Sequence, residues 1–157
     1  MSAIHPAEYS PASPDRRLAA SATWLAVPGR VLMSIIFLLS GFMKFSHLNA
    51  MASAVHMPPA LLGLAATVEV VGGLSLLLGV WSRWGAILLF LFLIPTTFMF
   101  HNFWAAPAAQ QQDQMAHFLK NLAIMGGLLA IAAYGAGPLS VDAATRRPRV
   151  ERDVHPA

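Results

Sequence analysis

The sequence predicts an all-α membrane protein that folds as a four-helix transmembrane bundle. Of its 157 residues, 57% are hydrophobic and 11% are charged, whereas soluble domains carry about 25% charged residues. Four apolar segments are each close to the roughly 20 residues that a spanning helix needs. We therefore expect one four-helix domain over residues 24–139, with spans at about 26–46, 61–80, 84–101 and 117–134.

The two flanks of this domain differ from it in composition. Residues 1–23 contain prolines at positions 6, 11 and 14 and show no apolar period, which predicts a disordered N-terminal segment. Arg16 and Arg17 precede an apolar segment that is too long for a cleaved signal sequence, so we expect an uncleaved first span. Residues 140–157 form a basic C-terminal tail.

The first span has its polar groups on one face. A four-three spacing places one set of side chains on that face: Arg30, Ser34, Phe37, Gly41 and Lys44. Arg30 and Lys44 either face protein or extend toward the two membrane interfaces, as long basic side chains do near helix ends. Met57-Pro58-Pro59 then separates the loop that follows from the second span.

The second span carries a carboxylate, Glu69, near its middle. An ionisable group at the centre of a spanning helix costs about 3 kcal/mol to insert, so it is expected to face protein or water and to have a partner. Gly72 and Gly73 lie on the same helical face, where small residues let another helix approach closely. Glu69 is therefore predicted to point into the bundle.

The third and fourth spans place further polar groups near their ends. Pro95 predicts a kink in the third span, with threonine hydroxyls at 96 and 97 to satisfy freed carbonyls, and His101 ends this span. A glutamine-rich loop follows at 105–115. The fourth span presents Lys120 on its polar stripe, with Asn121 alongside.

The distribution of basic residues predicts the topology. Only Lys44 and Lys120 fall on one side of the four-span arrangement; the arginines fall on the other, namely Arg16, Arg17, Arg30, Arg83, Arg146, Arg147, Arg149 and Arg152. By the positive-inside rule both termini and the turn at 80–84 should be cytoplasmic. The basic residues flank apolar segments, so their expected partner is the headgroup region of the lipid bilayer and no nucleic acid is expected.

Alternating spans would gather the ionisable groups at the outer end. Lys44, His101, Lys120 and Asn121 all lie there, and Glu69 lies roughly 12 Å below the start of its helix, by helix rise. We expect Glu69 to pair with Lys120, with Lys44 as the competing partner, on the floor of a pocket that opens toward the outer face.

Three roles for this pocket follow from its residues. A buried ion pair could serve only to fix helix register. The histidines at 47, 56, 101 and 117 invite a metal site, but they lack HxxxH or HExxH spacing and cysteine is absent, so we assign no metal. A quinone-like molecule would use aromatic walls, hydrogen-bond donors and a titratable group. The expected walls are Phe45, Phe98, Phe103 and Trp104.

Four motifs together resemble the DoxX family of bacterial four-span membrane proteins: RVLMSIIFLLSGFMKF, VEVVGGLSLLLGVWSR, FHNFW and FLKNLAIMGGLLAIAAYGAGPLSVD. The resemblance covers about residues 29–142. It implies a multi-pass inner-membrane protein whose relatives are often described as subunits of a quinone-reducing thiosulfate oxidoreductase or of a membrane oxidoreductase complex. The motif positions that carry over are Lys44, Glu69, His101, Lys120 and Asn121.

The resulting expectation is a membrane component of a redox system that binds a quinone-like molecule and works with a redox partner protein. Glu69 would exchange protons, while Lys44, Lys120 and His101 would donate hydrogen bonds, with Asn121 beside them. The alternative is a non-enzymatic carrier or binding module for a lipid, a small hydrophobic solute or a partner protein. A structural subunit without a ligand is a third interpretation, and the sequence contains no recognised catalytic motif.

Overall fold

The computed structural model describes residues 14–145, and every regular element in that range is helical. The elements, in order, are α1 (Pro14–Ser46), α2 (Leu48–Ala54), α3 (Pro59–Leu78), α4 (Ser82–Phe100), the short 3-10 helix η1 (Phe103–Ala105), α5 (Ala108–Tyr134) and α6 (Val141–Thr145). Four stretches are long and apolar enough to cross a membrane: Trp24–Ser46, Pro59–Leu78, Ser82–Ala105 and Ala108–Tyr134. The predicted fold class is confirmed.

Several helix boundaries differ from those expected. Helix α1 begins at Pro14, inside the segment expected to be disordered, and residues 1–13 lie outside the described part of the chain. Helix α5 begins at Ala108 instead of near residue 117, because its glutamine-rich first turns have good helix propensity and follow Pro107. The start of the expected tail folds as α6, and residues 146–157 again lie outside the described range.

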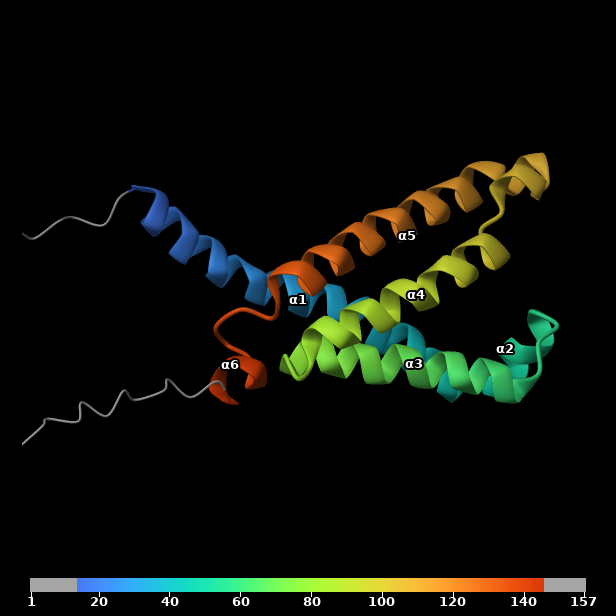
Figure 1. Ribbon diagram of the computed structural model, residues 1–157. Helices are drawn as coiled ribbons and strands as arrows, with labels where there is room; N and C mark the ends of the chain where they lie inside the picture. Colours follow the sequence, from blue (N-terminus) through green and yellow to red (C-terminus); the bar gives the residue numbers. More distant parts are fainter. Residues whose placement is uncertain (1–13, 146–157) are drawn as a thin grey trace, which may run out of the picture.

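The four long helices pack as two pairs. Helix α1 lies along α3, α4 lies along α5, and α3 and α4 form a hairpin that joins the pairs. Figure 1 shows the pairs converging at the α3–α4 turn, near α6, and spreading apart toward α2 and the α4–α5 connection. We call these the closed end and the open end. Which side of the membrane each end faces stays a prediction.

The core lies toward the closed end. Leu76, Leu89 and Leu128, from α3, α4 and α5, are completely buried there. Glycines permit this packing: a Cβ atom on Gly72 would lie 2.5 Å from Cγ of Leu89. This face of α3 therefore points into the bundle, as predicted from its paired glycines.

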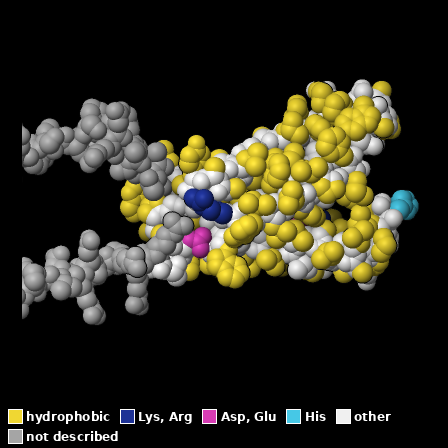
Figure 2. Space-filling model, viewed as in Figure 1, with side chains coloured by type: hydrophobic (Ala, Val, Ile, Leu, Met, Phe, Trp, Pro, Cys, Tyr) yellow, Lys and Arg dark blue, Asp and Glu magenta, His cyan; other side chains and the backbone are white. Residues whose placement is uncertain are grey.

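The outer surface is apolar. Figure 2 shows hydrophobic side chains over most of the visible face of the helices, with charged groups beside the grey termini and a histidine at the opposite end. At the closed end Trp81, Trp84 and Tyr134 are largely exposed. Aromatic residues of this kind are typical of the membrane–water interface.

Candidate functional site

The carboxylate in the middle of α3 is paired with a lysine from α1. Lys44 Nζ lies 2.8 Å from Oε2 and 2.9 Å from Oε1 of Glu69. The expected pair with Lys120 is wrong, and the competing partner is the correct one. Helix α1 packs along α3 whereas α5 packs along α4, so Lys120 turns to its own helix, where its Nζ lies 2.8 Å from Nδ1 of His117.

A serine completes this ion pair. Ser40 Oγ accepts a hydrogen bond from Lys44 Nζ at 2.6 Å and donates one to Glu69 Oε1 at 3.2 Å. The side chains of Lys44 and Glu69 are 18% and 8% exposed, so the pair is nearly excluded from solvent. Ser40 was missed by the sequence reasoning, although its position four residues before Lys44 on one helical face was a usable signal.

Close contact between α1 and α3 fixes the position of this pair. A Cβ atom on Gly41 would lie 2.7 Å from Cγ2 of Val70 and 3.0 Å from the carbonyl oxygen of Ala66. Only glycine allows the two backbones to approach this closely without a shift. Lys44, one turn further along α1, is thereby held beside Glu69.

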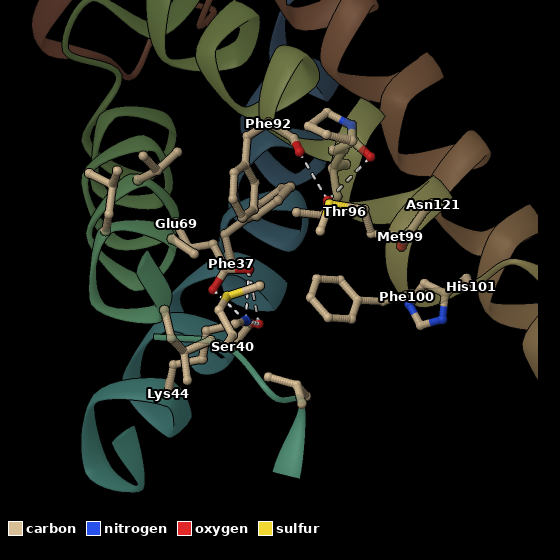
Figure 3. Close-up of a pocket in the computed structure, with 18 of the residues that line it drawn as sticks. Phe37, Ser40, Lys44, Glu69, Phe92, Thr96, Met99, Phe100, His101 and Asn121 are labelled. Atoms are coloured by element: carbon tan, nitrogen blue, oxygen red, sulfur yellow. Dashed lines mark hydrogen bonds and ion pairs between the residues drawn. The ribbon is translucent and has the colours of Figure 1, made fainter. Parts of the chain in front are cut away.

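The ion pair forms part of the wall of a cavity of about 590 Å³ toward the open end. Figure 3 shows Ser40, Lys44 and Glu69 on one side of this cavity and Thr96, His101 and Asn121 on the other. All five predicted site residues line it, namely Lys44, Glu69, His101, Lys120 and Asn121. Most of the remaining lining is apolar. The five residues therefore lie around one cavity, while their role in binding stays a prediction.

The aromatic residues of the cavity are not those expected. Phe37, Phe92 and Phe100 line it, whereas Phe45 is 48% exposed. The other expected residues pack together with Phe118 on a different face, at centroid distances from 5.2 to 6.1 Å: Phe98, Phe103 and Trp104. For Phe98 the cause is helix register, because neighbouring positions on α4 point about 100° apart, whereas Phe103 and Trp104 belong to η1, beyond the end of α4.

Polar contacts on the far wall join α4 to α5. His101 Nδ1 lies 2.9 Å from Oε1 of Gln114, and its ring stacks on that of His117 with centroids 5.0 Å apart. Asn121, 8% exposed, donates a hydrogen bond from Nδ2 to Oγ1 of Thr97 at 3.1 Å. No cluster of three potential metal ligands occurs among the described residues.

A second polar centre, at the closed end, holds Arg30. Its side chain is buried, with 3% exposed, and does not extend into the interface. Nη1 donates hydrogen bonds to the carbonyl oxygens of Leu76 and Leu77, both at 2.8 Å, and Nη2 donates to that of Leu139. Arg30 therefore joins the C-terminal end of α3, whose last carbonyls lack helical partners, to the segment before α6.

Asp142 completes this second centre. Its carboxylate accepts hydrogen bonds from the backbone N–H groups of Trp81 and Ser82, at 2.8 and 3.1 Å, and from Ser82 Oγ at 3.0 Å. It thus caps the N-terminus of α4 from a distant part of the sequence. The sequence reasoning missed it; the signal was the absence of a capping side chain at Trp81.

Comparisons with known proteins find a matching family model and similar chains. A family model described as DoxX matches residues 25–102. The chain is 33% identical over 116 residues to the inner membrane protein YqjF of Escherichia coli (strain K12), with 72% of this chain and 85% of that protein covered. It is 29% identical over 123 residues to the inner membrane protein YphA of the same strain, with coverage of 75% and 88%. No solved structure matches.

Proposed function

Because the chain belongs to the DoxX family and is a multi-pass protein of the bacterial inner membrane, we propose that it is a membrane component of a redox system and binds a quinone-like molecule. One observation carries this proposal. The Lys44–Glu69 pair is nearly excluded from solvent and yet borders a largely apolar cavity between the two helix pairs. Charged groups placed inside a membrane bundle are expensive and commonly mark ligand or proton pathways.

The size and lining of the cavity suit a flat amphipathic ligand. Its volume of about 590 Å³ lies within the range of small-molecule pockets, which are mostly apolar with a few orienting polar groups. Leu61, Leu64 and Met99 line it and are also substantially exposed on the helix surface. A lipid-soluble molecule would therefore have an apolar route from the bilayer into the cavity.

The polar groups offer a specific chemistry. Lys44 Nζ would donate a hydrogen bond to one carbonyl oxygen of the ring, and His101 or Lys120 to the other. Reduction to the hydroquinone adds two electrons, which a redox partner protein would provide, and one proton to each oxygen. Glu69 would pass one of these protons through Lys44, with which it is hydrogen-bonded at the cavity wall, and His101 or Lys120, beside the other oxygen, would pass the second.

A second candidate function is a non-enzymatic carrier or binding module for a lipid or small hydrophobic solute. The same observation of exposed apolar lining favours it, since Leu64 and Met99 are 59% and 60% exposed. In that function the ion pair would bind a polar headgroup and no electrons would be transferred. The two candidates differ in whether the ligand must be redox-active.

Ligand identity and the Glu69→Gln variant test the proposal. We expect mass spectrometry of the protein purified in its native lipids to detect a bound quinone. Short-chain ubiquinone should bind in nanodiscs, and Glu69→Gln should weaken it at least tenfold, about 1.4 kcal/mol. Asp113→Asn is the matched control, because its side chain is 74% exposed and lies outside the cavity.

The outcomes separate the candidates. Equal binding by wild type and Glu69→Gln would contradict a role for the ion pair in ligand binding. Equal binding of ubiquinone and of its redox-inert hydroquinone dimethyl ether, with no quinone-dependent electron transfer in native membranes, would favour the carrier.

A further inference from the structure

A second cavity, of about 560 Å³, lies at the closed end. It is formed between the first turn of α4 and the segment that runs from the end of α5 to α6. It shares no lining residue with the cavity that contains Glu69. Its side chains are aromatic and polar, and its position coincides with the belt of Trp81, Trp84 and Tyr134.

The cation of this cavity is Arg83. Its guanidinium lies over the end of α5, because a Cβ atom on Gly135 would be 3.5 Å from its Nε and 3.7 Å from its Nη2. Within the described part of the chain, no hydrogen-bond or ion-pair partner contacts this guanidinium. Its five N–H donors are therefore available to a ligand.

The one carboxylate in the cavity lining, Asp142, is already engaged. Three donors from Trp81 and Ser82 contact it at 2.8–3.1 Å, and it faces the N-terminus of α4. These three hydrogen bonds are directed toward the helix end, where a negative charge is favourable. Arg83 and Asp142 are the two charged side chains of the described lining, so the cavity presents a cation and a carboxylate whose own hydrogen bonds point to α4.

The aromatic side chains fix the depth of the cavity in the bilayer. Trp81, Trp84 and Tyr134 are 77%, 72% and 86% exposed. Such residues sit at the level of the lipid headgroups, with the ring in the apolar region and the N–H or O–H group toward water. The guanidinium of Arg83 therefore lies where lipid phosphates lie.

From these contacts we propose that this cavity binds the phosphate group of an anionic phospholipid. The planar fork of Arg83 contacts two phosphate oxygens, and Trp84 and Tyr134 supply additional hydrogen-bond donors at the rim. An anionic lipid such as phosphatidylglycerol is preferred to phosphatidylcholine because it brings its phosphate to Arg83 without a choline cation, which the guanidinium would repel.

The test uses the full chain in detergent and counts retained lipids by native mass spectrometry. Wild type should bind phosphatidylglycerol at least fivefold more tightly than phosphatidylcholine. Arg83→Gln should reduce this preference about fivefold, because one basic residue near the membrane surface contributes about 1 kcal/mol to binding of anionic lipid. Arg83→Lys should keep part of this preference, because lysine retains the positive charge but lacks the planar guanidinium that binds two phosphate oxygens at once. Asp113→Asn, which lies on α5 at the open end and lines neither cavity, is the control and should match wild type.

Other outcomes would overturn this assignment. If Arg83→Gln retains phosphatidylglycerol as wild type does, the lipid binds non-specifically around the transmembrane surface and not in this cavity. If millimolar inorganic phosphate displaces the lipid, the site recognises a free anion. Should Arg83→Gln fold poorly, Tyr134→Phe, which removes one exposed hydroxyl, should still weaken phosphatidylglycerol binding, and unchanged binding would contradict the proposal.

Discussion

The sharpest prediction concerns the two halves of the buried ion pair. Lys44→Met removes the ammonium and leaves the Glu69 carboxylate beside an apolar cavity with only Ser40 as a partner. Glu69→Gln removes the negative charge and leaves the lysine paired with neutral groups. The double variant removes both charges and keeps similar side-chain volumes.

The expected magnitudes follow from the burial of the pair. Breaking a fully buried pair by removing one partner costs about 3–5 kcal/mol, whereas replacing both can be neutral. Lys44 is 18% exposed, so its ammonium can partly regain water when Glu69 is replaced. Glu69→Gln should therefore lower the free energy of unfolding by about 1–2 kcal/mol, which is less than the loss expected for Lys44→Met. Lys44→Met should cost about 2–4 kcal/mol, because the carboxylate it strands is only 8% exposed.

Reversible unfolding in mixed micelles with increasing SDS, followed by tryptophan fluorescence, measures these free energies. The double variant should lie within about 1 kcal/mol of wild type, which gives a coupling energy of about 2 kcal/mol or more in a double-mutant cycle. Lys120→Met, whose lysine is exposed and forms a hydrogen bond with the neighbouring His117, should stay within about 0.5 kcal/mol of wild type. The assigned pair would be refuted if each single variant changed the free energy of unfolding by less than about 0.5 kcal/mol and the two changes were additive.

Three further predictions concern the closed end. Gly79→Ala should destabilise the protein by more than about 1 kcal/mol in the same unfolding assay, because φ is +66° and the new Cβ would collide with Ser140. Gly126→Ala, where nothing lies within 4 Å, should be neutral or stabilising by up to about 1 kcal/mol, and an equal loss at both sites would contradict this packing. Asp142→Ala should cost about 1–2 kcal/mol and speed hydrogen exchange at the Ser82 amide; unchanged exchange there would rule out the cap.

The sequence was sufficient for the fold because spanning helices are encoded locally. Length, hydropathy and the prolines and glycines between segments located all four spans. The Gly72-Gly73 pair also identified the buried face of α3, because a helix has a fixed period. Hydropathy did not locate the start of α5 at Ala108, because the polar, uncharged residues of its first turns extend the helix beyond the apolar segment.

The candidate site was harder to predict because its contacts join different helices. The sequence placed Lys44 and Lys120 at the same end, yet only the pairing of α1 with α3 decides which of them meets Glu69. The same is true of Arg30 and Asp142, whose partners are backbone groups far along the chain. Such backbone partners leave no pattern in side-chain composition, so the sequence left the orientation of Arg30 open and gave no role to Asp142.

The packing of α1 against α3 also bears on what the ion pair is for. The ion pair shares the role of fixing register with close packing, because a Cβ atom would lie 2.7 Å from Val70 Cγ2 at Gly41 and 2.9 Å from Leu38 Cδ2 at Gly73. Moreover, Lys44 and Glu69 both belong to the α1–α3 pair of helices, so their bond does not hold that pair against α4 and α5. What the two charges add beyond packing is a polar group in the cavity wall, which the proposed ligand binding would use.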